Sequence, residues 1–247
     1  MAAEPWVFLR GLGRERGHWE NFPENFGGHL NCAVICLDLP GSGSQCLESS
    51  PLSIEETMEK LREAAPLGAK YLFAISLGGM VAVEWARRHP EEIKGLVLIN
   101  SSLRTFSPLT QRLSLKAWPW LVSTSFTSDI RARERRILEF TAPSVTITPD
   151  QLSKRVELFE RHPMRRKNFL RQLWAASRYH PPLEAPHVPI LILYSEQDRL
   201  VDPRCSLKMA KSWKASIHPH PTAGHDLPLE DPDWCCRAVK DWLSNRS

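Results

Sequence analysis

No apolar run in this sequence approaches the roughly 18 residues that a helix needs to cross a bilayer, so we expect no membrane span. Residues 1–5 also lack the basic segment and the long apolar segment of a secretory leader, and they lead directly into the apolar stretch Trp6–Leu9. From these two absences we expect a cytoplasmic protein.

Patterns that bind metals or nucleotides are missing as well. The sequence has neither a GxGxxG loop nor a Walker-type loop, so a nucleotide cofactor has no support. Six cysteines are present without metal-ligand spacing: Cys32, Cys36, Cys46, Cys205, Cys235 and Cys236. We therefore expect no cofactor, no metal, and buried free thiols in a reducing compartment.

What the chain does contain is an alternation of short apolar runs with helical segments. The runs have the length of strands and lie at residues 6–9, 33–37, 71–75, 95–99, 190–194 and 216–218. Apolar strands that alternate with helices indicate a mostly parallel sheet with helices on both faces. The 247 residues, 42% of them hydrophobic, suffice for one α/β domain with an insertion.

Two helices carry start signals in the sequence. Ser53 followed by Glu56 forms a capping box, which predicts a helix beginning at Ile54. Near the end of the chain, Asp231 and Pro232 predict the start of a final helix whose apolar side chains share one face.

Residues 103–182 differ from the rest of the chain. They show no clear strand, and Pro119, Pro143, Pro149 and Pro163 divide them into several helices. They hold 15 Lys and Arg against 6 Asp and Glu, a net charge of +9, whereas the remainder carries −5. We expect residues 1–102 and 183–247 to form one core domain, with residues 103–182 inserted as a helical lid.

The run at residues 71–75 ends at a serine, and a helical stretch follows at once. This is the pattern of a nucleophile elbow, in which a serine hydroxyl stands on a sharp turn above the sheet. The turn tolerates only very small side chains two residues before and two after the serine, where this sequence has Ala74 and Gly78. Ser76 is therefore the predicted nucleophile.

A serine hydroxyl needs a base to take its proton, and the base needs a carboxylate to orient it. Asp198 lies in the loop after the run at 190–194, and His225 lies in a glycine-flanked loop before the last helix. Glu196 and Asp202 are the other candidate acids, but Glu196 precedes the apex of the loop and Asp202 is typical of a helix cap. We predict that Ser76, Asp198 and His225 form a catalytic triad.

Acyl transfer also needs N–H donors for the negative oxygen that forms on the carbonyl. One donor is the backbone N–H of Leu77, which follows the predicted nucleophile. The second is expected from Leu12, in the loop after the first strand. These two N–H groups form the predicted oxyanion hole.

These pieces together resemble the α/β-hydrolase superfamily. The matching segments are Gly11-Leu12-Gly13 with His18-Trp19, Asp38 to Gly43, Ser76 to Gly79, Arg88-His89-Pro90, Asp198 with Val201 to Pro203, and Gly224-His225. They span nearly the whole chain outside residues 103–182, and the resemblance implies an α/β-hydrolase fold. The sequence departs from the family pattern at Arg10, where histidine is usual, and at Ala74, where glycine is usual.

The substrate-binding residues are predicted from the same segments. Arg10 and Gly11 begin the loop that carries Leu12, and the long cation of Arg10 is expected either to reshape the acyl pocket or to pair with a substrate carboxylate. Trp118 and Trp120 belong to a set of aromatic residues at helical intervals, which is typical of core or of pocket lining. Nucleic acid is not expected as a partner.

The resemblance implies a serine hydrolase that cleaves carboxylic esters. In size and lid the chain is similar to the small bacterial carboxylesterases, a group that includes the methyl esterase acting on pimeloyl-carrier protein. A thioesterase, a lyase or C–C hydrolase with the same triad, and a non-catalytic binding protein remain as alternatives. The basic clusters at 131–136 and 165–171 are either a solvated helical face or a docking surface for an acyl carrier protein or a CoA-type substrate.

Overall fold

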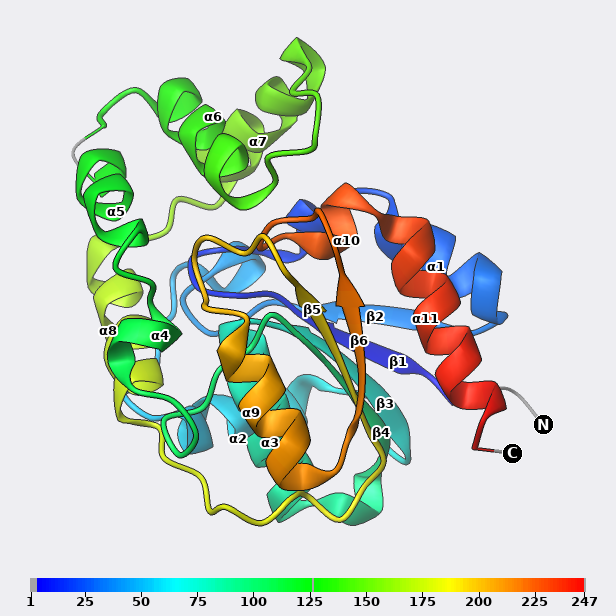
Figure 1. The fold of residues 1–247 in the computed structure, drawn as a ribbon. Helices are drawn as coiled ribbons and strands as arrows, with labels where there is room; N and C mark the ends of the chain where they lie inside the picture. The colour runs from blue at the N-terminus through cyan, green and yellow to red at the C-terminus, as the bar shows by residue number, and fades with distance from the viewer. Residues whose placement is uncertain (1–3, 126, 247) are drawn as a thin grey trace.

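Six parallel strands form the centre of the computed structural model, which describes residues 4–125 and 127–246 (Figure 1). They are β1 (Trp6–Leu9), β2 (Val34–Leu37), β3 (Lys70–Ile75), β4 (Ile93–Ile99), β5 (Ile190–Ser195) and β6 (Ser216–His220). Their order across the sheet is β2-β1-β3-β4-β5-β6, and every neighbouring pair is parallel. The predicted α/β fold is confirmed.

Helices cover both faces of this sheet because alternate strand residues point to opposite sides. Leu72 faces an apolar layer shared with α2, α3 and α9, whereas Phe73 faces a layer shared with α1 and α11 (Figure 1). The helices are α1 (Phe22–Leu30), α2 (Ile54–Ala64), α3 (Leu77–Arg88), α9 (Arg204–Trp213) and α11 (Pro232–Ser244), with the short α10 (Leu227–Glu230) before the last. All six cysteines are free thiols, but only Cys46, Cys205, Cys235 and Cys236 are buried as expected, whereas Cys32 and Cys36 are partly exposed.

Side-chain caps are present at the starts of the two helices whose first residues were predicted from the sequence. Ser53 accepts a hydrogen bond from the N–H of Glu56 (3.2 Å), and α2 begins at the next residue. The carboxylate of Asp231 accepts one from the N–H of Trp234 (2.9 Å), and Pro232 is the first residue of α11. Both predicted starts are therefore confirmed.

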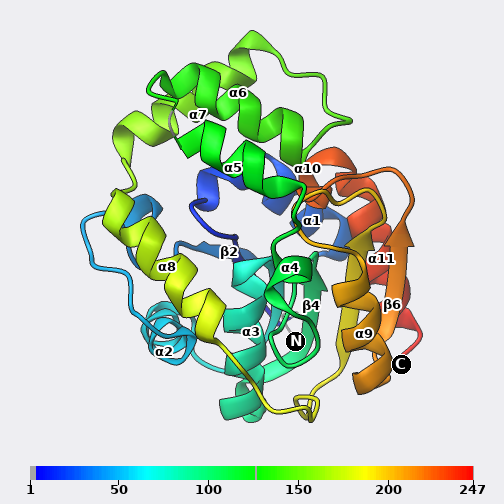
Figure 2. The same cartoon turned by 60° about the vertical axis from the view of Figure 1, so that its left-hand side comes forward.

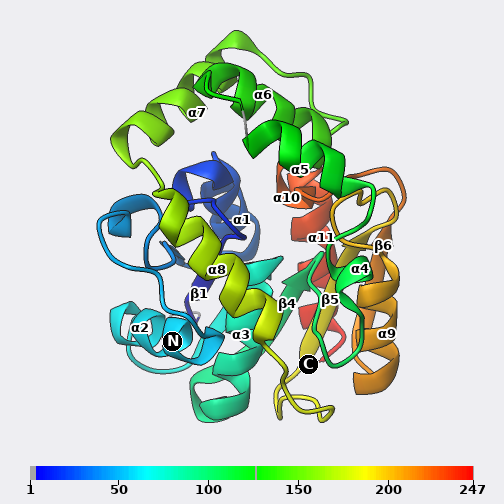
Figure 3. The same ribbon diagram turned by 90° about the vertical axis from the view of Figure 1, so that its left-hand side faces the viewer.

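Five helices lie between β4 and β5, and no strand occurs in the described part of residues 103–182, called here the helical segment. They are α4 (Leu109–Arg112), α5 (Ala117–Ser125), α6 (Ile130–Thr141), α7 (Pro149–Arg161) and α8 (Arg166–Arg178). Figure 2 shows α5, α6 and α7 together at one end of the molecule, and Figure 3 shows α8 leading from them back towards the sheet. Of the described helices, none is both long and apolar enough to cross a bilayer.

One of the four expected proline breaks is wrong. Pro143, Pro149 and Pro163 lie at or beside helix ends, but Pro119 is the third residue of α5. The first turn of a helix has N–H groups without an intrahelical partner, so proline loses no hydrogen bond there.

Polar contacts hold the helical segment against the core. Glu134 on α6 forms an ion pair with Arg14 (2.7 Å), which follows β1. Gln172 on α8 donates a hydrogen bond to the hydroxyl of Ser42 (3.0 Å), which follows β2. The helical segment therefore lies over loops at the carboxyl ends of two strands.

Candidate active site

Ser76 lies at the turn from β3 to α3 with a positive φ of 55°. This region is costly for a residue other than glycine and recurs at functional sites. The N–H of Ser76 donates to the carbonyl of Ile99 (2.9 Å), so the end of β4 supports the turn. The methyl group of Ala74 fits where glycine is usual, fully buried within β3. The turn has the backbone geometry expected of a nucleophile elbow.

Two glycines let the backbone approach this turn closely. A Cβ atom on Gly78 would lie 2.5 Å from the carbonyl oxygen of Leu9 and 2.6 Å from that of Arg10. A Cβ atom on Gly11 would lie 3.1 Å from the Cβ of Ser76. The loop after β1 (residues 10–14, called here the β1 loop) is therefore packed directly against the serine.

His225 and Asp198 are hydrogen bonded, with 2.8 Å between Nδ1 and Oδ2. The other carboxylate oxygen of Asp198 accepts from the N–H groups of Leu200 (2.8 Å) and Val201 (3.0 Å), which hold the carboxylate in place. Because an ionised carboxylate only accepts, Nδ1 carries the imidazole proton and Nε2 keeps a free lone pair. The pair has the tautomer that a general base requires.

The two rival acids lie elsewhere. Glu196 is exposed, and Asp202 accepts a hydrogen bond from the N–H of Arg204 (2.9 Å) at the start of α9. Arg204 also lowers the pKa of Asp202 through side-chain hydrogen bonds. Neither acid hydrogen bonds to His225 in the described chain.

Asn100, which sequence reasoning missed, joins the loop of His225 (residues 221–226, called here the histidine loop) to the end of β5. It follows β4 directly, and its amide nitrogen donates to the carbonyl of His225 (2.8 Å). Its amide oxygen accepts from the N–H of Ser195 (2.8 Å). In the sequence, the only indication of Asn100 was that a polar residue follows a predicted strand directly.

Within the described residues, no hydrogen bond joins the Ser76 hydroxyl to the imidazole of His225. Catalytic hydrogen bonds of this kind often form or shorten only when substrate binds.

The N–H groups of Leu12 and Leu77 donate to no other protein group in the part of the chain that is described. Leu77 is the first residue of α3, where the N–H points away from the helix and the helix dipole is positive. Leu12 lies in the β1 loop beside Gly11. Both N–H groups are free to bind an anionic oxygen.

Of the two roles expected for Arg10, reshaping the acyl pocket or pairing with a substrate carboxylate, the second does not fit the structure. Both terminal nitrogens of Arg10 donate to Asp226, at 2.9 and 2.7 Å, and the guanidinium lies 4.6 Å from the ring centre of Trp19. Sequence reasoning missed Asp226, because nothing local indicates a partner 216 residues away. The guanidinium is buried, and both of its terminal nitrogens are already paired.

The two predicted tryptophans lie on α5. Trp120 stacks on Phe140 of α6, with 4.2 Å between ring centres, and its indole N–H donates to the carbonyl of Arg136 (3.1 Å). Trp118 is 44% exposed. Trp120 therefore packs α5 against α6, and a substrate contact from either ring stays a prediction.

Beneath the helical segment, His18 is buried beside Arg14. The Nε2 of His18 lies 3.0 Å from a terminal nitrogen of Arg14, and the Nδ1 accepts a hydrogen bond from the backbone N–H of Glu15 (3.1 Å). Burial, followed by the charges of Arg14 and Arg155, lowers the pKa of His18 well below its ordinary value of 6.5. His18 is therefore a neutral structural group.

Cavity volume alone does not identify the site. A cavity of about 30 Å³, lined in part by Gly13, His18 and Met164, lies between the β1 loop and the helical segment. A much larger hollow of about 580 Å³ lies at the other end of the sheet, where Trp213 and Trp242 are among its lining residues. The larger hollow contains none of the predicted site residues.

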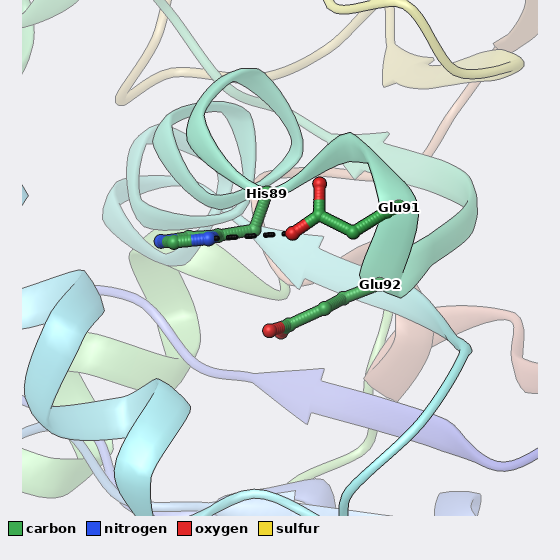
Figure 4. A group of neighbouring side chains, drawn as sticks. All are labelled: His89, Glu91 and Glu92. Carbon is green, nitrogen blue, oxygen red and sulfur yellow. Dashed lines mark ion pairs between the residues drawn. The ribbon is translucent and has the colours of Figure 1, made fainter.

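His89, Glu91 and Glu92 form a cluster of metal-ligand type, with ligand atoms within 4.8 Å of one another (Figure 4). Glu92 is already paired: burial opposes its ionisation, but Arg62, Trp85 and Lys70 lower its pKa to about 2. An adjacent arginine repels a metal ion. The cluster is better explained as a set of ion pairs at the end of α3.

A parallel sheet whose polar groups gather at the carboxyl ends of β3, β4 and β5 is the architecture of an α/β hydrolase. A family model described as alpha/beta hydrolase fold matches residues 5–232, and the chain belongs to this family.

Its relatives include esterases and C–C hydrolases. A pimeloyl-[acyl-carrier protein] methyl ester esterase of Hamiltonella defensa is 29% identical over 219 residues, 84% of this chain and 80% of the relative. A 2-hydroxy-6-oxo-6-phenylhexa-2,4-dienoate hydrolase of Comamonas testosteroni is 25% identical over 98% of this chain and 88% of the relative. A solved membrane phospholipase A, a bacterial virulence factor, has the same fold, with a TM-score of 0.79 at 22% identity over 98% of this chain and 79% of its own.

Proposed function

We propose that the protein is a serine hydrolase that cleaves carboxylic esters through an acyl-enzyme. The hydroxyl oxygen of Ser76 attacks the ester carbonyl, and the Nε2 of His225 takes the hydroxyl proton and returns it to the leaving alcohol. Asp198 holds the imidazole tautomer and stabilises the imidazolium. Water then attacks the acyl-enzyme, His225 takes its proton, and the acid leaves as Ser76 is restored.

The N–H groups of Leu12 and Leu77 complete the proposed machinery by binding the negative oxygen of each tetrahedral intermediate. Each such donor contributes on the order of 3 kcal/mol to transition-state stabilisation. Both N–H groups lack a protein partner in the described chain, which supports this role. Gly11 keeps the β1 loop close enough to Ser76 for Leu12 to take part.

The observation that carries the proposal is the 2.8 Å hydrogen bond between His225 and Asp198. It leaves an imidazole lone pair available in a loop that Asn100 ties to the end of β4, next to the serine turn. A non-catalytic binding protein would need none of this arrangement. The named activity of the Hamiltonella relative, an ester hydrolase, agrees with the proposal.

A C–C hydrolase is the second candidate, because the Comamonas relative aligns with nearly the whole chain. The same serine, histidine and acid serve both reactions, so only the products distinguish them. A panel of alkyl esters, thioesters and vinylogous diketones, analysed by mass, discriminates between an esterase, a thioesterase and a C–C hydrolase. We expect turnover of the alkyl esters to dominate.

The nucleophile is tested by Ser76→Ala. This variant should lose fluorophosphonate labelling and at least roughly 10³-fold of p-nitrophenyl butyrate hydrolysis, with a nearly unchanged thermal midpoint. Ser206→Ala, at a buried serine on α9, is the matched control and should keep both properties. Activity retained in Ser76→Ala would assign the nucleophile elsewhere.

We also propose that the helical segment acts as a lid that receives an anionic partner, such as an acyl carrier protein or a CoA-type substrate. Residues 103–128 and 163–182 contain eight Lys and Arg and no Asp or Glu. Figure 3 shows the helices of these stretches, α4, α5 and α8, on the side facing the viewer. The same stretches expose large apolar side chains: Leu109, Leu115, Trp118, Val122, Leu170 and Trp174. A surface that is both basic and apolar suits an acidic carrier that bears an acyl chain.

A further inference from the structure

Arg10 and Asp226 form a buried, bidentate ion pair next to the proposed catalytic groups. The two hydrogen bonds measure 2.9 and 2.7 Å, and the side chains are 4% and 7% exposed. Fork-to-carboxylate geometry of this kind fixes the relative orientation of the two groups.

The pair joins three parts of the molecule. Arg10 begins the β1 loop, two residues before Leu12, and Asp226 follows His225 directly. The backbone N–H of Asp226 donates to the carbonyl of Thr141 at the end of α6 (2.7 Å). The β1 loop, the histidine loop and the helical segment therefore meet at Asp226, the first through its carboxylate and the last through its backbone N–H.

A buried ion pair is a poor source of stability, because removing two charges from water costs about as much as their attraction returns. This pair instead orients the two loops relative to each other and sets the net charge near the imidazole of His225. Without Arg10, two buried carboxylates without a cation between them would lie near one imidazole: Asp198 in the loop after β5, and Asp226 next to His225. Burial opposes ionisation of Asp226, but the charge and hydrogen bonds of Arg10 hold its pKa below the usual value.

We propose that Arg10 and Asp226 are positioning residues, which lock the histidine loop to the β1 loop and cancel the charge of the second carboxylate beside His225. This inference rests on the proposed hydrolase function, since it gives the pair a role in that reaction. The charged groups around the imidazole are Asp198, hydrogen bonded to it, and Asp226, with Arg10 and Arg155 acting on Asp226.

If the pair acts on the imidazole, its substitution shifts the pH dependence of kcat/KM, whereas a purely structural pair would leave it unchanged. Arg10→Gln leaves Asp226 unpaired, so the imidazole holds its proton to higher pH and the acid limb of kcat/KM moves up by about one pH unit. Asp226→Asn leaves the charge of Arg10 unpaired and moves the same limb down. The double variant R10Q/D226N has no net charge at the pair and returns the limb to its wild-type position. Arg10→Lys keeps the charge but loses the fork, so it lowers kcat without moving the limb.

The matched control is a second buried cation, at the opposite end of the sheet from Arg10. Lys70 is 2% exposed and pairs with Glu92 (3.4 Å) at the start of β3, the end opposite Ser76. Lys70→Gln should lower the thermal midpoint and leave the pH profile unchanged. If Arg10→Gln behaves in the same way, the pair is structural only.

NMR titration of the imidazole in wild type, Arg10→Gln and Asp226→Asn measures the same shifts without turnover. Opposite shifts in the two single variants support the inference, and parallel or absent shifts overturn it. Full esterase activity in Ser76→Ala would instead overturn the proposed function, while the imidazole titration would still decide the role of the pair.

Discussion

At position 78 the backbone of the β1 loop leaves room for a hydrogen atom but not for a methyl group. A Cβ atom there would lie 2.5 Å from the carbonyl oxygen of Leu9, the last residue of β1, and 2.6 Å from that of Arg10, the first residue of the β1 loop. We expect Gly78→Ala to lower the free energy of unfolding by about 1–3 kcal/mol. It should also reduce ester hydrolysis, because the β1 loop must shift away from Ser76. Urea unfolding and initial rates measure the two effects.

Gly28→Ala is the control for this substitution. Gly28 lies in α1, and a Cβ atom there meets nothing within 4 Å. Alanine stabilises a helix by about 0.5–1 kcal/mol relative to glycine, so this variant should be equally or more stable and fully active. If Gly78→Ala changes neither the free energy of unfolding nor the rate of ester hydrolysis, the close approach at the turn is not required.

Among the helices, α8 carries the most direct test of partner docking. Arg165 and Arg166 are exposed where α8 begins, and no acidic residue lies in residues 163–182. Reversing both charges (R165E/R166E) should reduce kcat/KM for a carrier-linked ester by roughly tenfold at low salt, because steering by opposite charge is lost. Hydrolysis of p-nitrophenyl butyrate should be unchanged.

The matched reversal R237E/K240E lies on α11, which covers the opposite side of the molecule from α8 (Figure 1). It changes the net charge equally and should leave both substrates unaffected. Equal losses on both substrates in R165E/R166E would argue against docking at α8.

For the whole molecule, the buried neutral His18 makes stability depend on pH. Its pKa is lowered in the folded state, so below about pH 6.5 the unfolded chain binds a proton that the folded chain excludes. Stability is therefore lost as the pH falls from 6.5, by up to about 1.4 kcal/mol per pH unit from this group. His18→Gln should flatten the slope of the unfolding free energy between pH 6.5 and 5.

His29→Gln, which removes an exposed imidazole, provides the comparison. Urea unfolding at intervals of half a pH unit gives the three curves. A wild-type slope in His18→Gln would mean that carboxylates, rather than this imidazole, set the acid sensitivity.

The strands and the serine turn were predictable because their signals are local. Apolar runs identify strands, and small residues around Ser76 identify a turn that larger side chains block. The loops of Asp198 and His225 were predictable because parallel strands bring their carboxyl ends to one edge of the sheet. These features depend on a few neighbouring residues and on chain order.

The partners of the charged and aromatic groups were decided only by the tertiary structure. The sequence did not indicate that Arg10 pairs with Asp226, that Trp120 stacks on Phe140, or that Asn100 bonds the histidine loop. Local sequence fixes the type of a side chain and the element that carries it. Which loops meet across the sheet edge, and therefore which charge is neutralised and which stays free, follows from the packing of segments far apart in the chain.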